Sequence, residues 1–415
     1  MFADDLTLHD LKLFPHISAG RSLFDVLCCT KTIEGKEQLL KYLRRPLSTE
    51  EEVYNFQNLI QSILNEYEIW EKFHTLLSSE IFIEVKQQQD NQLLYSASLF
   101  KYRIKAPRKE SSVHEFIKNL FSICRNITEH SSTGENSIIH KMQITLSSFK
   151  KVAEGKFSRN YERWYCYNRN GKLFKTLLDD LYKIDALVSI ASVHKKFNFT
   201  FPKFSSNKNM HIENLRNILI TSSKPNSLRI PSDAETIFLT GANMSGKTTL
   251  LISIGQAVYL GRCGFGIPAT NAELPWFESI FCAFESNTIL EEGLSYFASE
   301  VKRSVEAVKL SGQEGTVLIL ADELFKGTNV KDSIDCLSYF TEKIKKKNVI
   351  SIISTHLTEF VVEYKEEGTQ FWCFEASMEY DKPVFDYTLK RGVSTQRMGF
   401  KILENALREQ REKDQ

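Results

Sequence analysis

Two patterns of hydrophobic and polar residues divide the chain. From Leu23 to about Thr200, apolar residues recur at helical spacing in long segments of mixed charge with few glycines. The helical pattern within residues 22–48 is expected to end at Arg45-Pro46, because proline disfavours helical backbone in the residue before it. Residues 51–73 and 176–197 carry clear apolar stripes, formed by Val53, Phe56, Leu59, Ile60 and Ile63 in the first and by Leu177, Leu181, Ile184, Leu187 and Ile190 in the second. We interpret these stripes as packing faces and predict an all-α first part.

The pattern changes near Ile230. Short apolar runs, "TIFLTG", "TVLILADE" and "NVISIISTH", alternate with helical segments, and each run ends in polar residues. Such runs are typical of buried parallel strands, whose carboxyl ends form the functional edge of an α/β sheet. The sequence therefore predicts a helical domain over residues 1–228 and an α/β domain over residues 229–415, with the boundary near Leu228 to Pro231.

Composition and charge narrow the class of protein. A chain of 415 residues has room for two or three domains with their own cores. The net charge of +1 does not indicate a nucleic-acid partner, although local basic faces can still bind one. The eight cysteines lack zinc-site spacing, so we interpret them as reduced and buried. The acidic N-terminus has no apolar signal region and no segment offers about 18 uninterrupted apolar residues, so we expect a cytoplasmic protein with no membrane partner.

One loop carries the clearest chemistry. Residues 241–248 match the phosphate-binding pattern G-x-x-x-x-G-K-[ST], and they lie between an apolar strand and a helical segment, which is the context that the pattern requires. Backbone N–H groups of this loop and the helix N-terminus can bind phosphate. The predicted ATP-binding residues are Gly241, Ala242, Asn243, Met244, Ser245, Gly246, Lys247, Thr248 and Thr249. Lys247 is expected to contact the β- and γ-phosphates and Thr248 to bind Mg²⁺.

Two further strand ends complete the predicted site. Asp322 and Glu323 follow the run "VLILA"; Asp322 suits the Mg²⁺ shell, and Glu323 can polarise the attacking water. His356 follows the run "VISIIS", where it can sense the γ-phosphate or position water, or act as a hydrogen-bonded structural histidine. The stretch "LSGQEG" at 310–315 is similar to the transporter motif LSGGQ. It lies too close to the next strand to open a helix, so we interpret it as a helix end and turn.

Several stretches together resemble the MutS family of DNA mismatch-repair ATPases. "TGANMSGKTTL" looks like that family's TGPNMxGKST, and "GLSYFASEVKR" resembles its S-T-F-x-x-E segment. "DELFKGTNVKDSI" and "STHLTEF" resemble DExxxGTxxxDG and ATHxxEL, and "GFGIPA" is similar to GxxVPA. Residues 20–47 resemble the start of the family's helical core domain. The resemblance implies an ABC-type P-loop ATPase domain preceded by an all-α core and lever domain.

The resemblance also implies an assembly and marks differences from it. MutS-type ATPases are dimers in which each ATP site contains residues of both subunits. Ser295 would then contact the γ-phosphate of the ATP bound by the partner subunit, and the loop after Glu323 would lie at the dimer interface. We expect the family's N-terminal mismatch-reading and connector domains to be lacking, and the clamp to be reduced or absent. The best internal candidate for phosphate-backbone contact is "KYRIKAPRK" at 101–109, with a solvated face as the alternative.

We therefore predict an Mg²⁺-dependent ATP hydrolase of DNA mismatch repair or recombination, in which ATP drives a DNA-binding clamp. Its expected partners are DNA of unknown structure and a second subunit, in a homodimer or a heterodimer formed through the ATPase domain, with a nucleoid-associated location if the source is bacterial. The alternative is a regulatory or scaffold ATPase that gates a protein partner without reading mismatches. A metabolic P-loop kinase is a more distant alternative, because a glutamate such as Glu323 that can polarise water favours hydrolysis.

Overall fold

The computed structural model describes residues 2–16, 20–80, 82–83, 119–120, 171–284, 296–364, 366–379, 382–394 and 403–404. The chain forms two compact units. One contains Met1–Val26, Pro46–Val53 and Phe197–Gln415, and the other contains Leu27–Arg45 and Tyr54–Lys196. Ser295, the basic stretch 101–109 and most of the polar segment 100–145 lie outside the described residues.

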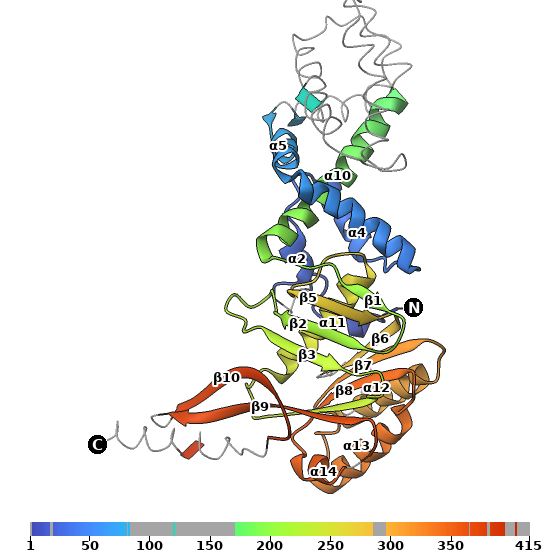
Figure 1. Cartoon of the computed structure of the whole chain (residues 1–415), viewed down its shortest axis with the longest axis vertical. Helices are drawn as coiled ribbons and strands as arrows, with labels where there is room; N and C mark the ends of the chain where they lie inside the picture. The colour runs from blue at the N-terminus through green and yellow to red at the C-terminus, as the bar shows by residue number, and fades with distance from the viewer. Residues whose placement is uncertain are drawn as a thin grey trace, which may run out of the picture. The chain divides into compact units, whose positions relative to one another are not determined.

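The regular elements described in the second unit are all helices (Figure 1). It contains α3 (Ile33–Leu43), most of α4 (Glu50–Asn65), α5 (Tyr67–Leu77) and nearly all of α10 (Gly171–Phe197), while α2 (Leu23–Leu27) ends where the unit begins. The apolar stripe of residues 176–197 is buried at every predicted position. The predicted helix over residues 51–73 is interrupted at Glu66, whose φ of −119° is not helical. This break lets α4 and α5 bury separate faces, with Trp70 and Phe73 fully buried on α5.

A buried carboxylate joins helices of this unit. Asp185 of α10 is fully buried and accepts hydrogen bonds from the backbone N–H groups of Lys31 and Thr32, at 2.9 Å each, and from the Thr32 hydroxyl at 2.7 Å. His74 Nε2 of α5 lies 3.1 Å from its Oδ1 atom. Thr32 in turn caps α3 by accepting the N–H of Gly35 at 2.9 Å. The start of α3 is therefore held from α10, because free N–H groups at a helix N-terminus need acceptors.

The first unit is built on a six-stranded sheet of order β10-β9-β4-β8-β7-β6. Its strands are β4 (Thr236–Thr240), β6 (Phe277–Ala283), β7 (Thr316–Asp322), β8 (Val349–Ser354), β9 (Thr369–Glu379) and β10 (Lys382–Arg391). All neighbours are parallel except β9 and β10, which are antiparallel. The three predicted strands are β4, β7 and β8, and they are adjacent in the sheet. An α/β P-loop architecture is thus confirmed for this unit.

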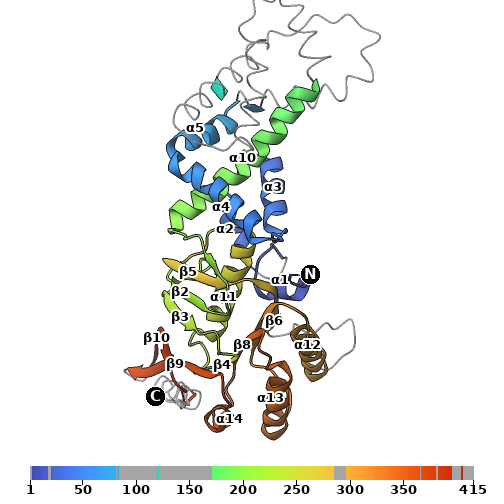
Figure 2. The ribbon, with the colours of Figure 1, turned by 45° about the vertical axis from the view of Figure 1, so that its right-hand side comes forward.

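Helices cover both faces of this sheet, which explains the continuous apolar runs. Figure 2 shows α12 (Tyr296–Ser311) and α13 (Val330–Ile344) together on one side and α11 (Lys247–Arg262) on the other. Val317 and Ile319 of β7 pack in the cluster under α12, α13 and α14 (Thr358–Glu363), whereas Leu320 approaches Gly255 of α11. The stretch "LSGQEG" forms the end of α12 and the turn before β7, as predicted.

A smaller sheet of order β1-β5-β2-β3 belongs to the same unit. It contains β1 (Lys203–Ser205), β2 (Met210–Leu215), β3 (Asn226–Ile230) and β5 (Asn271–Pro275). Because β2 pairs with both β3 and β5, residues 203–230 are held beside a strand that follows the phosphate loop. The α/β unit therefore includes Phe197 onward, which differs from the expected boundary at residue 228.

The N-terminal helix α1 (Asp5–Asp10) also packs on this unit. Arg303 of α12 donates to both carboxylate oxygens of Asp4, at 2.6 and 3.0 Å, and to the backbone oxygen of Cys282. The hydroxyl of Thr7 accepts the N–H of Cys282 at 3.0 Å. The first residues thus form part of the α/β core rather than of the helical unit. No helix in the described part of the chain combines the length and the apolar character needed to cross a membrane.

Candidate functional site: a phosphate loop with a carboxylate pair

The loop between β4 and α11 has the backbone that phosphate binding requires. Gly241 and Gly246 have φ values of 149° and 105°, and Gly246 is the N-cap of α11. A Cβ atom on Gly241 would lie 2.8 Å from the backbone oxygen of Phe374, so only glycine fits there. Met244 also has a positive φ, of 66°, and its side chain is 81% exposed. The loop therefore wraps tightly around the helix N-terminus and presents N–H groups toward the same space.

Lys247 occupies the centre of the site. Its Nζ atom donates to the backbone oxygens of Gly241 and Ala242, at 3.0 and 3.2 Å, and lies 3.5 Å from Glu323 Oε1. The residue is only 4% exposed, and burial lowers the pKa of its ammonium group while the nearby carboxylates oppose that shift. An anion entering the loop would therefore meet a poorly solvated positive charge that is already oriented.

Hard oxygen donors gather at the carboxyl ends of β7 and β8. The hydroxyl of Thr248 donates to Asp322 Oδ2 at 2.6 Å, and the hydroxyl of Ser354 donates to Asp322 Oδ1. One hydroxyl and one carboxylate fit Mg²⁺, which is usually held by one or two protein ligands together with phosphate oxygens and water. Within the described residues there is no group of three or more His, Cys, Asp or Glu side chains able to hold a metal. The arrangement therefore suits a metal that arrives with a nucleotide.

Glu323 and His356 form the other half of the site. Glu323 Oε1 lies 2.6 Å from His356 Nε2, and the backbone N–H of Glu323 donates to the oxygen of Ser354 at 3.1 Å. The hydrogen bond from His356, with the charges of Lys247 and Lys326, lowers the pKa of Glu323 to about 2 against the opposing effect of burial. The sequence placed these residues at separate strand ends, and the fold brings them within hydrogen-bond distance because β7 and β8 are neighbours.

A cavity of about 570 Å³ opens beside the loop. The loop residues Asn243 to Leu250 line it together with Glu323. Residues that the sequence analysis did not single out line the rest: Leu215, Asn217, Ile220, Ser222, Ser223, Lys224, Asn226, Ser253, Phe374 and Tyr387. These residues come from segments before and after the motif, so only chain folding could place them here. Thr249, the last of the predicted ATP-binding residues of the loop, lines the cavity as well. The predicted residue Ser295 lies outside the described part of the chain.

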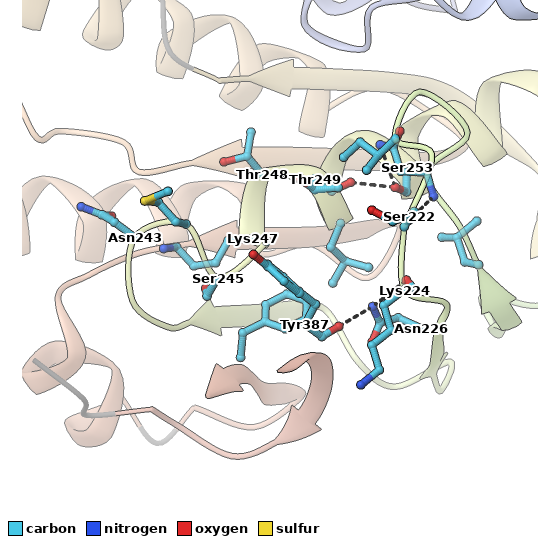
Figure 3. A pocket seen from close by; sticks show the side chains of 18 of the residues that line it. Ser222, Lys224, Asn226, Asn243, Ser245, Lys247, Thr248, Thr249, Ser253 and Tyr387 are labelled. Carbon is cyan, nitrogen blue, oxygen red and sulfur yellow. Dashed lines mark hydrogen bonds between the residues drawn. The ribbon is translucent and has the colours of Figure 1, made fainter. Parts of the chain in front are cut away.

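Tyr387 is an aromatic side chain that lines this cavity beside the loop (Figure 3). It lies at the irregularity in the pairing of β10 with β9 and has a φ of 51°. Asn226 holds this bulge: its Nδ2 atom donates to the oxygen of Tyr387 at 3.0 Å, and its Oδ1 atom accepts from the N–H of Leu389 at 2.7 Å. A Cβ atom on Gly246 would lie 3.4 Å from the Tyr387 ring. The bulge therefore holds an aromatic ring against the phosphate loop.

Comparison with known proteins agrees with this geometry. The family model described as MutS domain V matches residues 237–410. The chain is similar to the DNA mismatch repair protein MutS of Staphylococcus haemolyticus, at 26% identity over 53% of this chain and 26% of that protein. It is 30% identical to the endonuclease MutS2 of Streptococcus uberis over 49% of this chain and 26% of that protein. The MutS of Thermosipho melanesiensis aligns with 98% of this chain at 21% identity, and 62% of that protein is covered.

Proposed function

The chain belongs to the MutS family, and on this premise we propose that it is an Mg²⁺-dependent ATP hydrolase that acts in DNA repair or recombination. The observation that carries the proposal is the meeting of the two carboxylates with the phosphate loop: Thr248 contacts Asp322, and Lys247 lies beside Glu323. This juxtaposition supports hydrolysis rather than simple nucleotide binding.

Each residue then has a role that follows from its chemistry. Lys247 exchanges its contacts with loop carbonyls for phosphate oxygens, and the cavity beside Tyr387 receives the nucleoside, whose base can lie against the ring. Thr248 and Asp322 hold Mg²⁺, which when bound neutralises charge on the phosphates. The loop amides of residues 241–246 and the N-terminus of α11 complete the cradle.

Glu323 would orient the attacking water. With a pKa of about 2 it is a weak base, but phosphoryl transfer passes through a loose transition state in which water position matters more than basicity. The negative γ-phosphate would also raise the pKa of Glu323 by repulsion, so its basicity increases when substrate is bound. His356 keeps the carboxylate aimed by its 2.6 Å contact.

The proposal for the wider function is based on what the names of the relatives say. We propose that the chain works as a dimer through its ATPase unit, with Ser295 completing the partner's site, and that the helical unit acts as a core and lever whose movement is driven by ATP. DNA is the proposed ligand, and the cytoplasmic or nucleoid location remains a prediction. The alternative is a regulatory ATPase that gates a protein partner.

Steady-state ATP hydrolysis by the purified chain tests the proposal, measured alone and with duplex, mismatched and branched DNA. We expect hydrolysis that requires Mg²⁺ and changes with one DNA form. Lys247→Ala should lose nucleotide affinity, and Glu323→Gln should bind ATP normally while its kcat falls by about 100-fold or more. Normal hydrolysis by Glu323→Gln would refute the assignment of the water-orienting residue. A robust rate that no DNA changes would favour the regulatory alternative.

A further inference from the structure

The turn that carries Glu323 is strained. Glu323 and Phe325 have φ values of 52° and 64°, although neither is glycine. Left-handed backbone is unfavourable for a non-glycine residue, and such conformations persist only when the surroundings hold them. The position of the water-orienting carboxylate therefore depends on whatever anchors residues 323–327.

One anchor is the packing of Phe325 itself, which contacts α13 and the hydrophobic core. Its ring is 3% exposed and lies 6.0 Å from the ring of Phe340, centroid to centroid. The hydroxyl of Ser333 donates to the backbone oxygen of Phe325 at 2.6 Å. These contacts hold the middle of the turn but do not involve the backbone N–H groups of residues 325–327.

The second anchor is Glu300 of α12. The residue is only 4% exposed, and the backbone N–H groups of Phe325, Lys326 and Gly327 face its carboxylate, whose Oε2 atom has no hydrogen-bond partner among the described residues. Phe297, one helical turn earlier, places its ring 6.5 Å from that of Phe325. Two residues of one helix thus bind the segment that directly follows Glu323.

We propose that Glu300 is a positioning residue for ATP hydrolysis, whose buried carboxylate holds the strained turn after β7 so that Glu323 stays aimed at the reacting water. This inference rests on the proposed function. Glu300 acts through the backbone and is not among the residues that line the cavity.

The electrostatics of the turn support this role. A buried carboxylate is costly unless polar groups face it, and burial raises the pKa of Glu300 while the three N–H groups and the charge of Lys326 oppose that shift. Left-handed residues such as Glu323 and Phe325 persist only where their surroundings hold them, and the Glu300 carboxylate is one such support. Without it, the turn is free to relax and Glu323 moves with it.

The test compares Glu300→Ala and Glu300→Gln with wild type in the full chain. The matched control is Glu306→Gln, a glutamate on the same helix that pairs with Arg303 at 3.0 Å. We measure kcat, KM and the Kd for ATP, and hydrogen exchange of the 325–327 amides by mass spectrometry. Because misplacement of a reacting group by about 1 Å can cost about 100-fold, kcat should fall by about 100-fold in Glu300→Ala and by about 10-fold in Glu300→Gln, which keeps one acceptor oxygen.

The split between parameters distinguishes positioning from general stability. We expect Kd for ATP to change by less than about 2-fold in both variants while the 325–327 amides exchange faster, and the control to match wild type throughout. A kcat equal to wild type in Glu300→Ala, or a loss of ATP binding as large as the loss of kcat in Glu300→Gln, would overturn the inference. A wild-type chain that does not hydrolyse ATP would instead refute the proposed function, and Glu300 would then be only an anchor of the turn.

Discussion

Gly35 provides the sharpest test of the helical unit. It is the third residue of α3, and a Cβ atom there would lie 2.1 Å from Asp185 Oδ2 and 2.7 Å from the Thr32 hydroxyl. Neither neighbour is the far end of a flexible chain, since Asp185 is fully buried and both atoms are hydrogen-bonded to each other at 2.7 Å. Gly35→Ala therefore forces the carboxylate away from the start of α3.

The magnitude follows from the bonds that must break. Displacing Asp185 weakens its bonds to the N–H and hydroxyl of Thr32, and hydrogen bonds to a charged group contribute about 1.5–3 kcal/mol each. Alanine recovers about 1 kcal/mol over glycine inside a helix. We therefore expect Gly35→Ala to lower the free energy of unfolding by about 2–5 kcal/mol.

The assay is urea unfolding followed by far-UV circular dichroism, which reports on the helices. Gly312→Ala is the matched control, because a Cβ atom at that position meets nothing closer than the backbone oxygen of Lys309 at 3.5 Å, and we expect a change within about 0.5 kcal/mol. In an Asp185→Ala background, Gly35→Ala should destabilise the chain less, since the carboxylate clash is gone and only the contact with the Thr32 hydroxyl remains. A Gly35→Ala chain that is as stable as wild type would refute the close approach of α10 to α3.

Three further outcomes are expected. Arg303→Lys should lower the free energy of unfolding by about 2 kcal/mol and expose the first residues to proteases, because lysine cannot replace the bidentate hydrogen bonds to Asp4. Unchanged proteolysis would contradict the packing of α1 on this unit. Burial raises the pKa of Asp10 from 3.8 to about 7. The stability that its protonated form contributes is therefore present below pH 3.8 and lost as pH rises through 7. Asp10→Asn should be more stable than wild type at pH 8, and unfolding curves measured in parallel should show this gain shrinking toward pH 4. Thr248→Val should raise the Mg²⁺ concentration for half-maximal ATP hydrolysis by about 10-fold or more, because it removes the hydroxyl beside Asp322; an unchanged Mg²⁺ titration would exclude Thr248 as a ligand.

The sequence alone determined the α/β class and located the phosphate-loop motif. The loop pattern, the acidic pair Asp322-Glu323 and His356 are local features, and each follows an apolar run whose length and composition indicate a buried strand. Because neighbouring parallel strands end at the same edge, their convergence could be expected before the fold was known. The family resemblance rested on the same short motifs and is confirmed.

The tertiary structure decided what depends on distant partners. The cavity wall at Asn226 and Tyr387 comes from a strand before the loop and a bulge far after it, and no local pattern predicts a bulge held by a side chain more than 150 residues away. The attachment of residues 203–230 to the α/β unit arises from pairing of β2 with β5. The anchoring of the 325–327 amides by Glu300 likewise requires α12 to pack beside the turn. Sequence periodicity specifies which face of an element is buried, whereas packing alone decides which buried polar group meets which backbone amide.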